Sequence, residues 1–362
     1  MIYINGKFLA QRTTGVQRFA RGVVTALDCS LQSTPCGQDF ELLLPPAATP
    51  IEGLQVISQR VVGQPGRSLT AWEQMELPRH TSGGTLLCLS GSAPLFGVNC
   101  VPTIHDAAVY LYPQAYSRAF VTWYRLLFAR RARNSPLVLT VSESSARDLA
   151  PHLPRTAYRV VPNSAEHIVN QRSDTSVLNR LELKSGRYLL AVGSLNPTKN
   201  FSLLINTYRE SSLVDQLPLV IVGAINREVF SADSVNMEHP NVRWAGSIPD
   251  SQLRALYENA AVFVFPSLYE GFGIPPLEAM LCDCPVVASN ASSIPEICSD
   301  GAHYFDPRDP IEMLAAIQSV LESDDHRTSL IEKGRKRVNQ FNWDSSAASL
   351  RSALAEFGFI EQ

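Results

Sequence analysis

Residues 265–280 read Phe265-Pro-Ser-Leu-Tyr-Glu-Gly-Phe-Gly-Ile-Pro-Pro-Leu-Glu-Ala-Met280 and continue an apolar run over residues 261–265. The run is rich in Val and Phe, which predicts a buried strand. Gly271 and Gly273 permit a tight backbone path after the strand, and the two prolines that follow suit the first turn of a helix. The stretch therefore predicts a strand, a glycine loop and a helix in succession.

A junction of this kind favours a bound phosphate, because backbone N–H groups and the positive end of the helix dipole face the same point. Glu270 lies just before that point and Glu278 about one turn inside the helix. Carboxylates do not bind phosphate, but they accept hydrogen bonds from sugar and ribose hydroxyls. Together the groups indicate a nucleotide sugar. Taken singly, Glu278 also satisfies ordinary helix-dipole preferences, and Glu270 also fits a solvated loop acid.

The composition describes a well-cored globular protein. The chain has 362 residues, enough for about two domains, with 45% hydrophobic and 18% charged residues. Its formal charge of -3 does not favour broad electrostatic binding to nucleic acid, so no nucleic-acid partner is expected.

The cysteines and the N-terminus bear on the compartment. Seven cysteines without a repeated pair spacing favour free thiols in a reducing environment. We find neither a signal-peptide pattern nor an apolar run of about 18 residues, so a cytoplasmic protein is expected.

One helix-like segment, residues 116–133, leaves open a peripheral contact with the inner face of the cell membrane, because it interleaves five arginines with aromatic residues. Its apolar residues fall on one helical face, however, which favours a packed domain helix.

Strand-like and helix-like segments alternate along both halves of the chain, which predicts parallel α/β layers. We expect a first domain over residues 1–167, a polar linker over 168–186 and a second domain over 187–342, followed by a final helix within 343–362. Two such halves predict two Rossmann-like domains facing a cleft. Ligands of open parallel sheets sit at the carboxyl ends of the strands.

A second phosphate candidate is Val192-Gly-Ser-Leu-Asn-Pro-Thr-Lys-Asn200, which also follows a strand and opens a helix. Lys199 supplies a positive charge there. The alternative is a surface turn with Asn200 as the helix cap. Near the N-terminus, Gly15 and Val16 open a helix after the first strand and bring backbone N–H groups to the same edge, toward a diphosphate or an acceptor. His105 follows another predicted strand, where a lone histidine is also compatible with a structural role.

The whole string from Glu270 to Glu278 resembles the signature of the retaining glycosyltransferases of the GT-B fold, family 4 or glycosyl transferases group 1, of the bacterial polysaccharide type. The segments around His105, Lys199, Gly15 and residues 241–249 are similar to motifs of the same family. The resemblance covers most of the chain. It implies a first domain for the acceptor, a second for the nucleotide-sugar donor, and a last helix that crosses back to the first domain.

The resemblance also implies a role for each candidate residue. The catalytic residues would be Glu270, which holds a donor-sugar hydroxyl, and His105, which orients the sugar, while Glu278 would bind the ribose. Main-chain groups of Gly246, Ser247 and Ile248 would bind the base. The diphosphate would be bound by Lys199, Ser194, Gly271, Phe272, Gly273, Ile274, Gly15 and Val16.

The loop around Lys199 departs from the family pattern, which usually adds an arginine. Ser194 follows Gly193 and Thr198 precedes Lys199, so neither of the two places where the arginine is expected carries one. Neutralisation of the diphosphate then rests on Lys199, on backbone amides and on an arginine from elsewhere. This puts the strength and identity of donor binding in question, and not the fold.

We expect no cofactor and no metal, because the sequence has neither an Asp-x-Asp triplet nor a His/Cys cluster of metal spacing. The expected reaction is a retaining transfer of a hexose, first mannose from GDP-mannose, to a hydroxyl of a lipid-linked or growing bacterial surface glycan. The alternatives are a UDP- or dTDP-sugar donor, a GT-B epimerase or phosphorylase, and a catalytically weak nucleotide-sugar-binding subunit. A phosphorylase would need a pyridoxal-phosphate lysine and a much longer chain.

Overall fold

The computed structural model describes residues 1–32, 39–154, 156–223 and 239–361. Its contacts divide the chain into two units. Unit 1 comprises Met1–Ser164 together with Trp343–Gln362, and unit 2 comprises Ala165–Asn342. Cys36 lies outside the described residues, and the six described cysteines are free thiols.

Unit 1 is built on parallel strands. Five of them form a sheet in the order β3-β2-β1-β4-β5, and β6 and β7 pair with each other. Thr103, directly after β5, bridges Leu139 of β6 and so continues the parallel pattern. The strands are β1 Ile2–Asn5, β2 Phe40–Leu44, β3 Ser58–Val61, β4 Thr85–Cys88, β5 Asn99–Pro102, β6 Leu137–Thr140 and β7 Ala157–Val160.

The helices of unit 1 lie between these strands in the chain, except for the last helix, which follows unit 2. The α-helices are α1 Gly15–Leu31, α2 Leu69–Ala71, α3 Ala108–Leu111, α4 Arg118–Arg133, α5 Glu143–Leu149 and α13 Trp343–Glu356. Residues Trp72–Glu76 form a π-helical turn, η3. The 3₁₀ turns are η1 Gly6–Ala10, η4 Leu77–His80 and η5 Pro113–Ala115.

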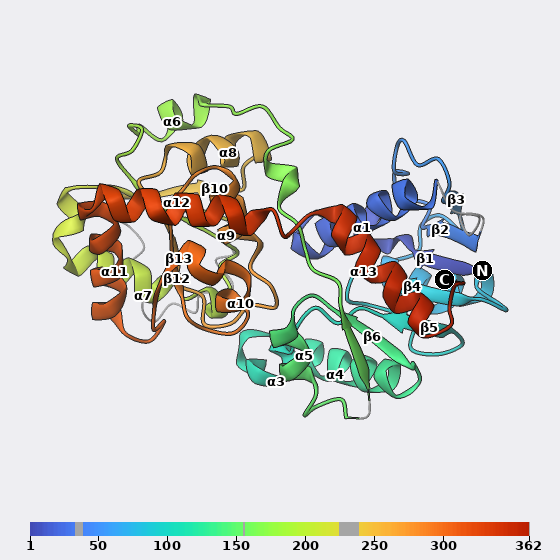
Figure 1. Ribbon diagram of the computed structural model, residues 1–362. Coiled ribbons are helices and arrows are strands. Elements are labelled where there is room, and N and C mark those ends of the chain that lie inside the picture. Colours follow the sequence, from blue (N-terminus) through green and yellow to red (C-terminus); the bar gives the residue numbers. More distant parts are fainter. Residues whose placement is uncertain (33–38, 155, 224–238, 362) are drawn as a thin grey trace. The chain divides into compact units, whose positions relative to one another are not determined.

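The last helix of the chain is packed into unit 1, where α13 runs beside α1 (Figure 1). Gly22 of α1 faces the ring of Trp343 so closely that an added Cβ would lie 2.3 Å from it. Ser346 Oγ donates to the Pro162 carbonyl over 2.8 Å. The expected return of the last helix to the N-terminal unit is therefore confirmed.

Unit 2 contains a six-stranded parallel sheet in the order β10-β9-β8-β11-β12-β13. This is the strand order of a doubly wound Rossmann sheet. Its central strands have no polar side chains and no exposed residues, as strands covered on both faces require. The strands are β8 Leu189–Val192, β9 Leu219–Val222, β10 Val242–Gly246, β11 Val262–Phe265, β12 Val286–Ser289 and β13 Ala302–Phe305.

Helices flank this sheet. The α-helices are α6 Ser176–Arg180, α7 Phe201–Glu210, α8 Asp250–Asn259, α9 Ile274–Leu281, α10 Ile294–Cys298, α11 Pro310–Glu322 and α12 Asp324–Val338. The 3₁₀ turns are η6 Glu166–Ile168, η7 Pro197–Lys199, η8 Ser212–Asp215 and η9 Ser299–Gly301.

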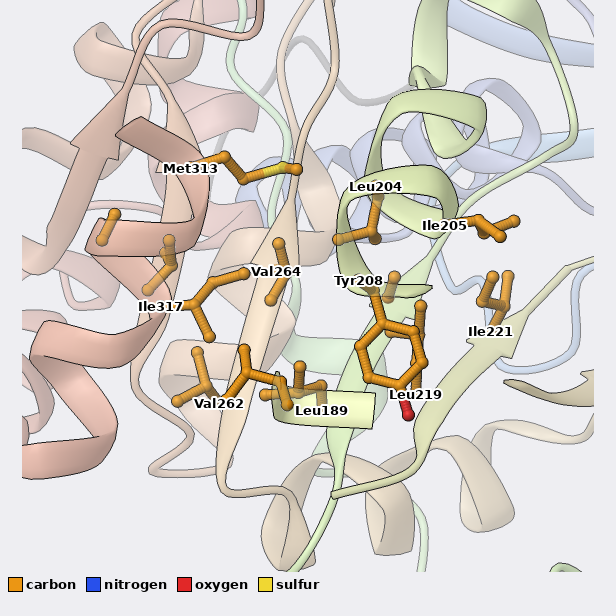
Figure 2. Close-up of a cluster of buried hydrophobic side chains, with 14 of the residues drawn as sticks. Leu189, Leu204, Ile205, Tyr208, Leu219, Ile221, Val262, Val264, Met313 and Ile317 are labelled. Carbon is orange, nitrogen blue, oxygen red and sulfur yellow. The ribbon is translucent and has the colours of Figure 1, made fainter. Parts of the chain in front are cut away.

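One hydrophobic cluster of unit 2 lies between the sheet and two of its helices, α7 and α11. Figure 2 shows Leu204 and Tyr208 of α7 pointing toward the strands, and Ile317 of α11 beside Val262 and Val264. Burial of apolar side chains is the dominant favourable term in folding.

Three expectations differ from the structure in detail. The edge strand β3 was not anticipated, because Ser58-Gln-Arg-Val61 is polar and largely exposed. The helix expected over residues 276–282 begins two residues earlier, at Ile274 of α9, because Gly273 takes a left-handed conformation with φ 101° and starts the helix there. Residues 168–186, expected as a linker, include α6, which packs against α8 within unit 2.

Candidate active site

The centre of the unit 2 sheet is a topological switch point. Strands β8 and β11 are neighbours there, although the chain leaves β8 toward β9 and leaves β11 toward β12. In sheets of this type the crevice at the carboxyl ends of the two diverging strands is where ligands bind. The loop after β8 carries Lys199, and the loop after β11 carries Glu270.

The two loops meet through main chain and side chains. The N–H of Leu268 donates to the Thr198 carbonyl over 2.7 Å. Lys199 Nζ lies 2.7 Å from both carboxylate oxygens of Glu270, and these side chains are 21% and 10% exposed. Ser267 Oγ donates to Glu270 Oε1 over 2.7 Å. The switch point therefore holds one partly accessible ion pair supported by a hydroxyl.

Two adjacent serines after β12 fix the glycine loop. Ser292 Oγ accepts the N–H of Glu270 at 2.8 Å. Ser293 Oγ, which is fully buried, lies 3.0 Å from the carbonyl oxygen of Glu270 and 2.9 Å from that of Phe272. These contacts hold the backbone on both sides of Gly271, so the loop is shaped before any ligand arrives.

The start of α9 offers fewer hydrogen-bond donors than a typical helix N-terminus. Ile274 is its first residue, and Pro275 and Pro276 follow. Because proline has no N–H, Ile274 alone provides a donor among the first three residues of the helix. An anion at this end would depend on the N–H groups of the preceding loop and on Lys199.

Glu278 is enclosed, with 5% of its surface exposed. Tyr257 of α8 donates its hydroxyl to Glu278 Oε2 over 2.9 Å, and His167 Nε2 lies 2.8 Å from Oε1. Burial, followed by the charge of Glu278, holds the pKa of Tyr257 well above its ordinary value, so this hydroxyl stays protonated. Both carboxylate oxygens of Glu278 thus already have a protein partner.

The expected base-binding residues lie at the end of β10. Gly246 has φ 69°, and its carbonyl accepts the N–H of Gly223 at 3.0 Å. At Gly223 an added Cβ would lie 1.9 Å from the Gly193 carbonyl oxygen, so only glycine fits where Gly223, directly after β9, approaches Gly193, directly after β8. Ser247 and Ile248 follow directly on Gly246.

In unit 1, His105 follows β5 and has a defined orientation. Its Nε2 lies 2.9 Å from the Leu89 carbonyl, and its ring meets Phe19 edge-on with centroids 5.0 Å apart. A carbonyl only accepts, so Nε2 carries the proton and the neutral ring keeps Nδ1 as an acceptor. Burial lowers the pKa of His105 to about 4 and outweighs the Leu89 hydrogen bond. At neutral pH His105 is therefore uncharged.

Gly15 and Val16 are the first two residues of α1. The N–H groups at such positions have no carbonyl partner within their own helix. Thr14 and Gln17 form a capping box around this end, with the Thr14 N–H donating to Gln17 Oε1 over 3.1 Å.

The comparisons with known proteins bear on both units. The family model of the glycosyl transferases group 1 matches residues 178–337. Over 255 residues the chain is 30% identical to the O-antigen chain mannosyltransferase B of Escherichia coli, covering 68% of this chain and 67% of that protein. The chain belongs to the glycosyl transferases group 1 family. It is also 28% identical to the O-antigen chain mannosyltransferase RfbU of Salmonella typhimurium, over 70% of this chain and 69% of that protein.

Solved structures place this family member in the GT-B fold. The sucrose-phosphate synthase from Thermosynechococcus elongatus superposes with a TM-score of 0.73 at 19% identity, over 98% of both chains. The expected family and the expected fold are thus confirmed. Membership makes the protein a glycosyltransferase, an enzyme of the hexosyltransferase type.

The structure brings some expected site residues of this glycosyltransferase together within unit 2. Lys199 meets Glu270, whereas the described partner of Gly246 is Gly223, which was not an expected site residue. His105, Gly15 and Val16 belong to unit 1. Their roles toward one donor molecule stay a prediction, as do the roles of the unit 2 residues.

Sequence reasoning missed the side chains that hold the site residues in place. Their signal was weak, because each is an ordinary residue type in an ordinary position. The serines could have been found from their place at the carboxyl end of a predicted strand, whereas His167 and Tyr257 carry no local signature. The residues are Ser267, Ser292, Ser293, His167 and Tyr257.

Proposed function

We propose that the protein is a retaining, metal-independent glycosyltransferase that moves mannose from GDP-mannose to a hydroxyl of a lipid-linked or growing bacterial surface glycan. The observation that carries the proposal is the Lys199–Glu270 pair at the carboxyl ends of β8 and β11, beside the N-terminus of α9. The choice of mannose is supported by the two relatives, whose names describe mannosyltransferases of O-antigen chains.

In the proposed reaction the charge that needs stabilising develops on the leaving group. When the bond between the sugar and the diphosphate breaks, negative charge grows on the diphosphate. Lys199 and the N–H groups from Gly271 to Ile274 would stabilise that charge from fixed positions, which is the most effective form of electrostatic catalysis. Ser194 lies in the same loop as Lys199 and would add a hydroxyl.

Glu270 would accept a hydrogen bond from a donor-sugar hydroxyl. Its carboxylate is already held by Lys199 and Ser267, so it would place the sugar without a further loss of conformational freedom. Glu278 would accept the ribose hydroxyls, and Gly246, Ser247 and Ile248 would contact the base through main-chain groups.

His105 would orient the donor sugar. As a neutral ring with Nδ1 as an acceptor, it suits a sugar hydroxyl better than it suits a charged phosphate. This is a positioning role and not a general-base role.

The alternative functions differ from the proposed one in the donor that is used or in catalytic activity. A UDP- or dTDP-sugar would use the same diphosphate and ribose contacts, because the expected base contacts come from the main chain. A catalytically weak nucleotide-sugar-binding subunit is favoured by Ser194 and Thr198, which stand where the family usually has an arginine.

A panel of nucleotide sugars tests the proposal. Release of nucleoside diphosphate is measured with and without lipid-linked glycan acceptors, for the wild type and for Glu270→Gln. We expect acceptor-dependent release with GDP-mannose and a loss of about 10²–10³-fold in the variant. Equal turnover by the variant would remove Glu270 from the mechanism. An inverted anomeric configuration of the product, read by NMR, would contradict retention.

Metal independence is tested in the same assay by adding a chelator. Among the described residues no three His, Cys, Asp or Glu side chains gather in a metal-binding arrangement. We expect turnover to survive an excess of chelator. Loss of turnover on chelation, restored by Mg²⁺ or Mn²⁺, would contradict this part of the proposal.

We also propose that unit 1 contacts an anionic membrane surface through α4. This helix has five arginines and no acidic residue, whereas the whole chain carries a charge of -3. Arg118, Arg130 and Arg133 are exposed, and Leu126 is 53% exposed. Basic side chains beside apolar ones fit the headgroup region of anionic lipids. No helix within the described ranges is long and apolar enough to span a bilayer.

Vesicle flotation tests this contact. Arg130→Gln with Arg133→Gln should release the protein from phosphatidylglycerol vesicles, while the matched pair Arg335→Gln and Lys336→Gln on α12 should not. Binding to phosphatidylcholine alone should be weak for every variant. Unchanged flotation of the α4 variant would contradict the proposal.

A further inference from the structure

The carboxylate of Glu278 is held between two side chains from different elements of unit 2, Tyr257 of α8 and His167 of η6. We propose that His167 is a positioning residue for the nucleotide, which fixes Glu278 so that it can accept ribose hydroxyls. The inference rests on the proposed role of Glu278 and adds a residue to it.

The hydrogen-bond roles follow from the chemistry of the three groups. An ionised carboxylate only accepts, so His167 Nε2 must carry a hydrogen and donate a hydrogen bond to Glu278 Oε1. Tyr257 donates to Oε2. Each carboxylate oxygen of Glu278 has two lone pairs, so one lone pair on each oxygen is not used by Tyr257 or His167. The remaining lone pairs are two acceptors at a fixed spacing, which suits the vicinal hydroxyls of a ribose.

His167 itself is anchored through its backbone. Its neighbour Ile168 is fully buried, and Arg254 of α8 donates to the carbonyls of Val169 and Gln171 over 2.8 and 2.7 Å. The turn η6 also packs against α9, the helix that carries Glu278. The ring therefore approaches Glu278 from a rigid support.

The second ring nitrogen of His167 indicates a role beyond packing. Nδ1 is buried and has no protein partner among the described residues, which is unfavourable for stability. Stability alone does not account for a histidine whose second nitrogen is buried and unpaired, whereas a donor that holds Glu278 in place does.

The test measures discrimination between hydroxylated and deoxygenated ribose. Calorimetric titration compares GDP with its 2′-deoxy and 3′-deoxy analogues, and the UDP series is run in parallel. Loss of a hydrogen bond to a charged group should weaken binding to the wild type by about tenfold or more for at least one analogue.

His167→Phe should weaken binding of GDP itself by about tenfold and should reduce the discrimination to about twofold or less, because Glu278 is no longer held. His167→Gln, which keeps the donor, should restore most of the wild-type ratio. His303→Phe, a matched substitution on β13, should leave the ratio unchanged. Thermal unfolding of each variant establishes that it is folded.

Each outcome decides a different point. If folded His167→Phe keeps the wild-type discrimination, His167 does not position Glu278 for ribose and the inference is overturned. If the wild type binds GDP and UDP but never discriminates against deoxyribose, the role of Glu278 fails and the inference fails with it. If the wild type binds neither series, the proposed function itself is wrong.

Discussion

Lys199 Nζ lies 2.7 Å from both carboxylate oxygens of Glu270, although the two residues are 71 positions apart in the chain. The contact joins the loop after β8 to the loop after β11 at the switch point of the unit 2 sheet. If Lys199 binds the donor diphosphate as proposed, the diphosphate must compete for the lysine with the Glu270 carboxylate, which already pairs with it. Donor binding is then an exchange of partners at Lys199.

This exchange predicts non-additive effects of substitution. Lys199→Ala should lower kcat/KM by about 10²–10³-fold, since it removes the charge that stabilises the leaving diphosphate. It also leaves the carboxylate of Glu270 without its lysine partner, next to the bound diphosphate. The double variant with Glu270→Ala should therefore bind GDP more tightly than Lys199→Ala alone. Calorimetric titration of the four proteins measures the coupling, and strictly additive affinities would contradict an exchange.

The lowered pKa of His105 predicts an acid-sensitive fold. Its pKa in the folded protein is about 4, against 6.5 for the free side chain, so the unfolded chain takes up a proton in this interval and the folded one does not. The contribution of His105 to stability is present above pH 6.5 and declines toward pH 4, by up to about 3 kcal/mol.

Urea unfolding at pH 7.5 and pH 5 measures this change. His105→Gln can keep the donor to the Leu89 carbonyl and cannot titrate, so its stability should depend less on pH over this range. A variant with the same pH dependence as the wild type would show that other groups cause the acid sensitivity.

Two glycines with positive φ should differ in their tolerance of alanine. At Gly223 a Cβ would lie 1.9 Å from the Gly193 carbonyl oxygen, whereas at Gly246 nothing lies within 4 Å. Gly246→Ala should cost only the backbone strain of about 1–2 kcal/mol. Gly223→Ala should cost more than that, because it adds a steric clash to the strain. Urea midpoints rank the two, and equal losses would contradict the close approach of Gly223 to the Gly193 carbonyl.

The serine that supports the glycine loop should affect donor use as well as stability. Ser293→Ala removes the hydroxyl that lies against the Glu270 and Phe272 carbonyls and should destabilise unit 2 by about 1–3 kcal/mol. It should also raise the KM for the donor, because the loop before α9 loosens.

A matched control is Ser346→Ala in unit 1, where an equally buried serine donates to a carbonyl. It should lower stability without changing the donor KM. Equal KM effects in the two variants would contradict a specific role for Ser293.

The central strands of unit 2 could be predicted from the sequence because of their burial. Strands β8 and β11 are continuous apolar runs covered on both faces, so periodicity and β-branched content identify them within one residue. Edge strand β3 could not be found in this way, since its side chains face solvent and its pairing with β2 comes from tertiary structure.

The candidate site was only partly predictable, for a related reason. A glycine loop and a carboxylate after a strand are local signals, so Glu270, Glu278 and Lys199 were found one by one. Their partners depend on which strands become neighbours. The Lys199–Glu270 contact needs β8 beside β11, and the His167–Glu278 contact spans 111 positions.

A crystal structure of the protein soaked with GDP tests the central claim most directly. We predict density for the diphosphate against Lys199 and the N–H groups of Gly273 and Ile274, with the ribose hydroxyls on Glu278 and the Lys199–Glu270 contact lengthened or shared. A nucleotide bound away from the carboxyl ends of β8 and β11, with Lys199 and Glu270 still paired as in the free protein, would contradict the account.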